Sequence, residues 1–463
     1  MDELGQWDGV ATAQAIAKGQ VSAAEVVEAS IARAERLDPQ LGFMVTADYD
    51  RARELATRSR EGGPLAGVPT LIKDLDDYAG LPTRRGSRAT HGAGPACGHT
   101  AFVQAVLDTG MIPLGKSATP EFGYLPTTEP TGFPPTRSPW DPTRSAGGSS
   151  GGAAAAVAAG VVPLAHASDG GGSIRIPASC CGLVGLKPSR GRTRDTGPQP
   201  FPIELSVQLC VSRTVRDTAA MLEVVEDEAT HLPKVGRVET ASSRRLRVGL
   251  LMKGADSAPD SDVARVVENT ATLLTGLGHH VEPTSWPQAF AGMGDTFLLA
   301  WAKGAANNLA EFEERLGRPV GPDEFEAFSL AMPQLIASLP PEAVTDAVAA
   351  LETLVPVYRA WLEQYDVLMS PVLSLPPPEL GWITGQVPVD ALGERLKYYV
   401  AYTGAFNVVG APAVSLPLGQ SSSGLPIGVQ FGGRIGDERT LLELAYELEE
   451  AQPWHDQRPP LFG

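Results

Sequence analysis

Two short loops of the sequence combine serine with several glycines. Gly147-Gly-Ser-Ser-Gly151 contains the first serine pair, and Gly170-Gly-Gly-Ser173 ends on a second candidate. The backbone N–H groups of residues 170–173 can point at one spot without obstruction by side chains, which is how an oxyanion hole is built. Ser173 beside such a loop is a candidate nucleophile. A serine hydroxyl is a weak nucleophile, however, and needs a base close by.

Lys73 is the candidate base. It closes the apolar run at residues 68–72, and a lysine desolvated at the end of a buried strand can lose its proton well below its ordinary pKa of about 10.4. The same residue could instead pair at the surface with Asp74, Asp76 or Asp77. The glycine loops could likewise be flexible turns. The residue types alone leave both interpretations open.

A third pattern suggests nucleotide binding. The segment Gly110-Met-Ile-Pro-Leu-Gly-Lys-Ser117 matches the P-loop formally. A helix is expected before it, and apolar residues occupy the place of the phosphate cradle. Pro113 lacks an N–H group altogether. We therefore interpret this segment as the end of a helix, a turn and a strand.

Residues 147–151 also fit the G-x-S-x-G elbow of α/β-hydrolases, which would make Ser149 the nucleophile of an esterase. The proline-containing segment 139–145 that precedes it cannot form the core strand that this motif requires. The esterase would also need a histidine base, and no histidine lies in an obvious catalytic loop. The five histidines that follow Ser149 in the sequence are His166, His231, His279, His280 and His455.

Composition narrows the classes of partner. The 463 residues carry a formal net charge of −17, which argues against nucleic acid and against an anionic membrane surface. The first residues lack the basic and apolar regions of a signal peptide, and no stretch is long and apolar enough to span a bilayer. Four cysteines show no metal-ligand spacing, and two of them are adjacent. We expect a protein of the reducing cytoplasm.

Hydrophobic patterns indicate the elements that must position these residues. Residues 1–60 are expected to be helical, with a capping box at Ser22 and Glu25. Strands and helices then alternate, which predicts one α/β domain with a mixed, mostly parallel sheet covered by helices on both faces. Strands are expected at 65–75, 111–114, 161–165, 247–251, near 281, and near 367, 413–416 and 427–431. Helices are expected after Thr100, from Ala153, at 262–277, over much of 287–365, and at 437–450.

The central stretch strongly resembles the amidase signature family. The resemblance rests on Gly147-Gly-Ser-Ser-Gly-Gly152 and on Ser168-Asp-Gly-Gly-Gly-Ser-Ile-Arg-Ile-Pro177. It extends over nearly the whole chain through these further segments: Gly67–Asp74, Gly115–Ser117, Cys181–Pro188, Phe406-Asn407 and Gly424–Gln430. The family resemblance implies one amidase signature domain over residues 1–463, with N-terminal helices at 1–60, a signature core at 61–200 and a helical substrate-lining region at 287–365.

The resemblance also implies roles for individual residues. Ser173 corresponds to the nucleophile, Ser149 to a proton relay on a cis peptide bond, and Lys73 to the neutral base. No metal or organic cofactor is implied. Backbone N–H groups of Gly170, Gly171 and Gly172 would hold the oxyanion, and Asp169 and Arg175 would support the loop. Gly170 departs from the Thr, Ile or Ala that relatives often have, which suggests a slightly more flexible loop.

Within the family, the chain looks similar to bacterial amidases that act on aryl, cyclic or short linear amides, including the nylon-oligomer hydrolase group, some of which also cleave esters and carbamates. Ile176 replaces the Gln usual in the tRNA-amidating branch, so a tRNA partner is not expected. The expected partner is a small amide, bound by a monomer or homodimer. Tyr124 and residues 287–365 are candidates for lining the pocket, with ordinary packing as the alternative. A catalytically silent binding protein on this scaffold is a further alternative.

Overall fold

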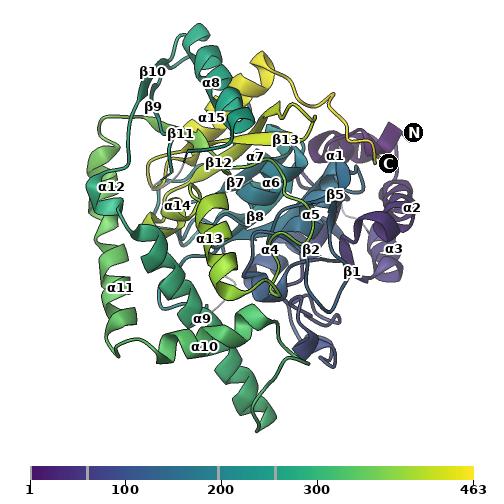
Figure 1. The fold of residues 1–463 in the computed structure, drawn as a ribbon. Coiled ribbons are helices and arrows are strands. Elements are labelled where there is room, and N and C mark those ends of the chain that lie inside the picture. Colours follow the sequence, from purple (N-terminus) through teal and green to yellow (C-terminus); the bar gives the residue numbers. More distant parts are fainter. Residues whose placement is uncertain (1–2, 59–61, 195–198, 255–257) are drawn as a thin grey trace.

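Three β-sheets organise the chain (Figure 1), and the computed structural model describes residues 3–58, 62–194, 199–254 and 258–463. The large sheet has eight strands, in the order β10 (His280–Pro283), β9 (Arg247–Leu250), β11 (Val367–Pro371), β13 (Pro426–Gly432), β12 (Ala413–Gln420), β7 (Val184–Lys187), β8 (Val207–Ser212) and β6 (Leu164–Asp169). A second sheet has the order β1 (Met44–Ala47), β3 (Ile112–Ser117) and β2 (Pro69–Lys73). A small hairpin pairs β4 (Arg137–Ser138) with β5 (Asp141–Ser145).

Helices flank the large sheet, as predicted (Figure 1). The described α-helices are α1 (Gly9–Ala17), α2 (Ala23–Leu41), α3 (Tyr49–Thr57), α4 (Ala101–Asp108), α5 (Gly151–Ala158), α6 (Arg175–Cys181), α7 (Val215–Val225), α8 (Ser261–Gly276), α9 (Met293–Leu316), α10 (Ala327–Ala337), α11 (Ala343–Glu352), α12 (Leu354–Trp361), α13 (Val389–Tyr399), α14 (Gly404–Val409) and α15 (Glu438–Ala451). Short 3-10 helices lie at Glu3–Gly5, Arg88–Thr90, Glu121–Gly123 and Gln288–Phe290.

Local sequence signals explain where several of these elements begin. The Ser22 hydroxyl accepts the Glu25 N–H and the Glu25 carboxylate accepts the Ser22 N–H, which is the predicted capping box at the start of α2. Thr100 caps α4 by accepting the N–H of Val103. The apolar run before Lys73 forms β2, all five residues of which are buried. Residues 287–365 are mostly helical, as predicted.

The prediction of a mostly parallel sheet is wrong. The large sheet is mixed, but only the β10–β9 and β9–β11 pairs are parallel, and the other five pairs are antiparallel. Two features cause this. Strands β12 and β13 are joined by the tight turn at 421–425, which reverses the chain. Strand β8 inserts in the opposite direction between β6 and β7, although α6 connects those two strands as a crossover would.

Five strands were not predicted: β1, β4, β5, β7 and β8. The first 60 residues are not helical throughout, because β1 pairs with β3, and the proline-containing segment 139–145 contributes to the β4–β5 hairpin outside the large sheet. The most consequential difference concerns β2, which belongs to the small sheet and lies beside β6 of the large one. The Thr70 hydroxyl donates to the Leu164 carbonyl at 3.1 Å across this junction. Residues near the ends of β2 and β6 are therefore brought together.

Candidate active site

Lys73 lies at the carboxyl end of β2 and is fully buried. Burial lowers the pKa of Lys73 to about 7, against opposing effects of the charges on Asp76 and Asp169. A lysine with this pKa is largely uncharged above neutral pH and can accept a proton. A surface ion pair, the alternative considered for this residue, is excluded by its burial.

Two serine hydroxyls contact the Lys73 amine. Its Nζ lies 2.8 Å from Ser149 Oγ and 2.9 Å from Ser168 Oγ. A neutral amine offers two N–H groups and one lone pair, so it can donate to Ser168 while accepting the proton of Ser149. Ser149 is nearly buried and follows a cis peptide bond after Gly148, the geometry expected of the relay. Ser168 lies within the sequence motif, on β6, but no role was predicted for it.

Ser173 lies in the turn between β6 and α6, with 8% of its surface exposed. The carboxylate of Asp169, the last residue of β6, shapes this turn. It accepts the N–H of Gly172 at 2.7 Å and the N–H of Ile174 at 3.2 Å, on either side of the serine. Within the described residues, Ser149 and Ser173 are not hydrogen-bonded to each other. Catalytic hydrogen bonds often tighten only when substrate is bound.

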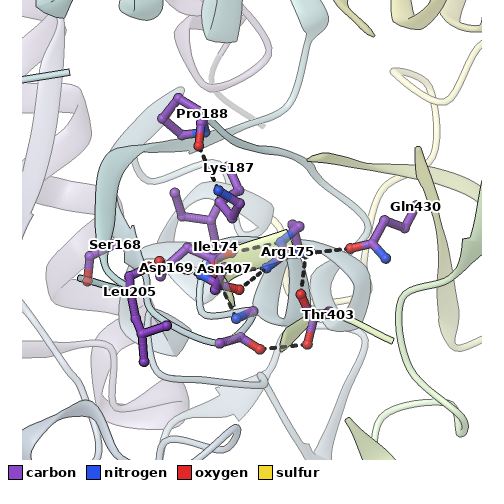
Figure 2. Close-up of polar contacts among 12 residues, drawn as sticks. Ser168, Asp169, Ile174, Arg175, Lys187, Pro188, Leu205, Thr403, Asn407 and Gln430 are labelled. Atoms are coloured by element: carbon purple, nitrogen blue, oxygen red, sulfur yellow. Dashed lines mark hydrogen bonds and ion pairs between the residues drawn. The ribbon is translucent and has the colours of Figure 1, made fainter. Parts of the chain in front are cut away.

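Arg175 forms an ion pair with the Asp169 carboxylate (Figure 2). Its Nε and Nη2 each lie 2.9 Å from one carboxylate oxygen, and both side chains are fully buried. The guanidinium also donates to Asn407 Oδ1 at 2.7 Å, to Gln430 Oε1 at 2.6 Å and to the Thr403 carbonyl at 3.0 Å. Burial alone would raise the pKa of Asp169, but the charge and hydrogen bonds of Arg175 outweigh it and hold that pKa well below its ordinary value. These contacts are those expected of residues that support the loop.

The glycines before Ser173 differ in their backbone contacts. The N–H of Gly172 is engaged by Asp169, so this group of the three predicted oxyanion donors already has an acceptor. The N–H groups of Gly170 and Gly171 therefore remain as candidate oxyanion donors. The Gly171 carbonyl accepts the Thr403 hydroxyl at 2.6 Å, which fixes the orientation of the next peptide unit.

Helix α9 covers this glycine loop. A methyl group on Gly170 would lie 3.1 Å from the Trp301 ring, and one on Gly171 would lie 3.1 Å from the Phe297 ring. The two rings stack with centroids 5.5 Å apart. The close approach explains why glycine fits at these positions, and it brings part of the predicted lining region 287–365 against the loop.

His166 lies behind Lys73 and does not face Ser149. Its Nδ1 accepts the backbone N–H of Lys73 at 3.2 Å, and its Nε2 lies 2.8 Å from Gln208 Oε1. Burial lowers its pKa, so the ring is neutral. Because both ring nitrogens are engaged, His166 is not available as the base of the esterase considered above. It instead holds the backbone that carries the lysine.

Comparison with known proteins agrees with this geometry. A family model described as Amidase matches residues 25–442. The chain belongs to the amidase signature family. It is a hydrolase that acts on carbon–nitrogen bonds.

Three relatives illustrate the likeness of this amidase to known proteins. The putative amidase AmiC of Mycobacterium leprae (strain TN) is 40% identical over 458 residues, which are 98% of this chain and 97% of that protein. The solved structure of 6-aminohexanoate cyclic dimer hydrolase has a TM-score of 0.92 at 33% identity and covers 100% of this chain and 99% of that one. A bacterial aryl acylamidase of the same family has a TM-score of 0.87 at 27% identity, with 98% of each chain covered.

A cavity of about 240 Å³ reaches Ser168, whose hydroxyl contacts Lys73. Ser168 and Tyr124 both line it, and the Tyr124 hydroxyl accepts the Asn308 amide N–H at 2.6 Å. Tyr124 therefore lines a cavity together with Ser168, and its part in binding a substrate stays a prediction. From region 287–365 only Asn308 of α9 lines this cavity, so most of that region does not. The cavity is lined by Leu75, Asp76, Asp77, Arg85, Thr100, Phe122, Tyr124, Ser168, Gln199, Pro200, Phe201, Ser206, Gln208 and Asn308.

The P-loop-like segment has a structural role in the amidase. Lys116 lies on β3, fully buried, where its Nζ donates to the Asp76 carbonyl at 2.6 Å and pairs with Asp74 Oδ1 at 3.2 Å. Its ammonium is thus committed to protein groups and not to phosphate. Across the described ranges there is no group of three or more His, Cys, Asp or Glu side chains that could hold a metal ion. No helix in that part of the chain is long and apolar enough to cross a membrane.

Proposed function

We propose that this amidase hydrolyses small amides through an acyl-enzyme on Ser173. The observation that carries the proposal is the buried 2.8 Å contact between the amine of Lys73 and the hydroxyl of Ser149. A buried lysine with a pKa near 7 can act as a base at physiological pH. The neighbouring serine then connects that base to the loop that carries the nucleophile.

The proposed cycle starts with neutral Lys73. As Ser173 Oγ bonds to the substrate carbonyl carbon, its proton passes to Ser149 Oγ while the Ser149 proton passes to Lys73 Nζ. The N–H groups of Gly170 and Gly171 stabilise the oxyanion. Ser149 then protonates the leaving nitrogen and regains a proton from Lys73, so the C–N bond breaks. Water, deprotonated through the same relay, attacks the acyl-enzyme and releases the acid.

The supported substrate class is broad. Aryl amides and cyclic or linear oligoamides are proposed from the resemblance to the aryl acylamidase and to the cyclic dimer hydrolase. Esters and carbamates could react by the same attack at a carbonyl carbon. The cavity of about 240 Å³ that reaches Ser168, called the inner cavity below, is lined by the aromatic side chains of Phe122, Tyr124 and Phe201. These side chains favour an apolar group beside the reacting carbonyl.

The proposed setting is a monomer or homodimer in the cytoplasm, acting on small molecules without nucleic acid or membrane. The acidic net charge of −17 supports the absence of a nucleic-acid partner. The four cysteines Cys97, Cys180, Cys181 and Cys210 are free thiols, which agrees with a reducing compartment.

A serine-directed probe tests the nucleophile without knowledge of the substrate. The protein is treated with a fluorophosphonate, and the adduct is located by mass spectrometry of its peptides, with Ser173→Ala as the matched control. We expect one adduct, on Ser173, that is absent in the variant. An adduct on Ser149 would favour the esterase alternative, and complete lack of labelling would favour a silent binding protein on this scaffold.

A further inference from the structure

Arg85 lies on a wall shared by two cavities. The inner cavity of about 240 Å³ reaches Ser168, which contacts the catalytic lysine. A second cavity of about 540 Å³ adjoins it, against residues 89–96 and the end of α9. Asp77 and Arg85 line both cavities. A group bound at Arg85 would therefore lie between the second cavity and the reacting end of a substrate placed beside Ser168.

The backbone at Arg85 is strained. In the described part of the chain, Arg85 and Phe122 are the non-glycine residues with positive φ, at 52° and 49°. Both line the inner cavity, and the Phe122 N–H donates to the Arg85 carbonyl at 2.8 Å. Such residues persist where surrounding structure enforces them, and they cluster at ligand sites. A second hydrogen bond holds the backbone here, because the Arg85 N–H donates to the Asp74 carbonyl at 3.1 Å.

The same turn is anchored to a helix outside the catalytic core. Ser87, two residues after Arg85, donates its hydroxyl to Glu121 Oε1 at 2.8 Å. The other oxygen of Glu121 accepts the Glu326 N–H at 3.0 Å and the Ser329 hydroxyl at 2.5 Å, at the start of α10. The backbone that carries Arg85 is thus held in place before any substrate binds, which reduces the entropy lost on binding.

Arg85 is the basic residue among those that line the inner cavity. The acidic lining residues already have hydroxyl partners, since Thr83 donates to Asp77 at 2.6 Å and Thr100 to Asp76 at 3.3 Å. No carboxylate in the described ranges pairs with the half-buried Arg85 guanidinium. Its N–H groups therefore point to an acceptor that the chain itself does not supply.

We propose that Arg85 binds a carboxylate carried by the substrate, away from the amide that is cleaved. The substrate class is then a linear amide that ends in a free acid, with an apolar segment in the inner cavity. Arginine is suited to this role because its planar fork matches both oxygens of a carboxylate. The inference rests on the proposed function, because it assumes that the amide reacts beside Lys73 at the inner end.

The test compares substrates that differ only at the far end. One series consists of anilides of hexanoic acid that end in a carboxylate, a carboxamide or an ammonium group. A second series places the same three groups on the aniline ring, so that the leaving side is also sampled. In at least one series we expect the carboxylate substrate to have a kcat/KM about tenfold or more above that of its carboxamide. In Arg85→Gln this preference should fall towards one, and Arg85→Lys should recover part of it.

Arg84→Gln is the matched control. Its guanidinium donates to the Thr90 carbonyl at 3.2 Å and does not line either cavity, so the preference should equal that of the wild type. Equal losses for carboxylate and carboxamide substrates in Arg85→Gln would overturn the proposal, because they would indicate a purely structural role. A wild-type preference for the ammonium substrate would overturn the proposal too, because it would indicate that Asp77, and not Arg85, determines which charged group binds there.

A binding measurement separates failure of this inference from failure of the proposed function. Calorimetry with Ser173→Ala and the carboxylate substrate needs no turnover. Binding that weakens tenfold or more on adding Arg85→Gln supports the site even if no amide is cleaved by the wild type. Cleavage with binding that does not depend on Arg85 would keep the proposed function and refute the carboxylate site.

Discussion

Raising the pH from 5 to 9 is expected to convert Lys73 from ammonium to amine, and with it to increase the reactivity of Ser173. The base form is the productive one, so the rate should rise with pH and level off above the pKa. Burial lowers that pKa from 10.5 to about 7. The midpoint of the rise is therefore expected near pH 7.

The size of the effect follows from this shift. A lysine with its ordinary pKa has only about one neutral molecule in 3,000 at pH 7, whereas a pKa near 7 makes about half of the molecules neutral. Burial thus increases the concentration of base by roughly three orders of magnitude. At pH 5 the neutral fraction falls to about 1%, so the rate should drop about fiftyfold below its value at pH 7.

The assay is the rate of fluorophosphonate labelling of Ser173 across this pH range, with circular dichroism to check that the protein stays folded. Asp76→Asn is a control for which the direction of the pKa shift of Lys73 can be predicted. The charge of Asp76 favours the ammonium form of Lys73, so its removal should move the midpoint to lower pH. A flat profile, a midpoint near pH 10, or a shift of Asp76→Asn to higher pH would refute the assignment of Lys73 as base.

Three further changes test the support of the site. Arg175→Met leaves the Asp169 carboxylate buried without its partner, so urea denaturation should show a loss of about 3–5 kcal/mol in the free energy of unfolding. An unchanged free energy of unfolding would contradict the role of Arg175 in supporting Asp169. Gly172→Ala would place a methyl 2.6 Å from neighbouring side chains at a φ of +133°, so labelling of Ser173 should slow at least tenfold while the circular dichroism spectrum is kept. Lys116→Met should also lower the free energy of unfolding by about 3–5 kcal/mol, because Asp74 becomes unpaired. ATP should leave the Tm of the wild type unchanged, and a Tm that rises with ATP would favour the P-loop interpretation.

The residues around the reaction were predictable because their motifs are local. Lys73 ends a short apolar run, and Ser149 and Ser173 lie in two glycine loops that lie close together in the sequence. The run alone left a surface ion pair open for Lys73, and it was the family resemblance that implied the neutral base; the structure shows the burial that lowers the pKa of this lysine. Ser168 was missed because its contribution depends on β2 lying beside β6, a neighbourhood that strand patterns do not reveal.

The support of the loop could be predicted only in part. Asp169 and Arg175 lie within the motif, but the acceptors Thr403, Asn407 and Gln430 reach Arg175 from far along the chain. Periodicity carries no information about such pairings. The prediction of mostly parallel strands was wrong for a related reason. Alternation of strands and helices suggests parallel crossovers even where another strand inserts between the two connected strands.

The bracing of Arg175 has a consequence for the time at which the enzyme becomes active during its synthesis. Its partners at Thr403, Asn407 and Gln430 lie 228, 232 and 255 residues further along the chain. At usual translation rates these residues leave the ribosome about 10 to 50 s after the serine loop. A nascent chain thus carries Ser173, the proposed nucleophile, long before the loop can be held in shape, and we expect hydrolysis to begin only when the last strands of the large sheet have docked.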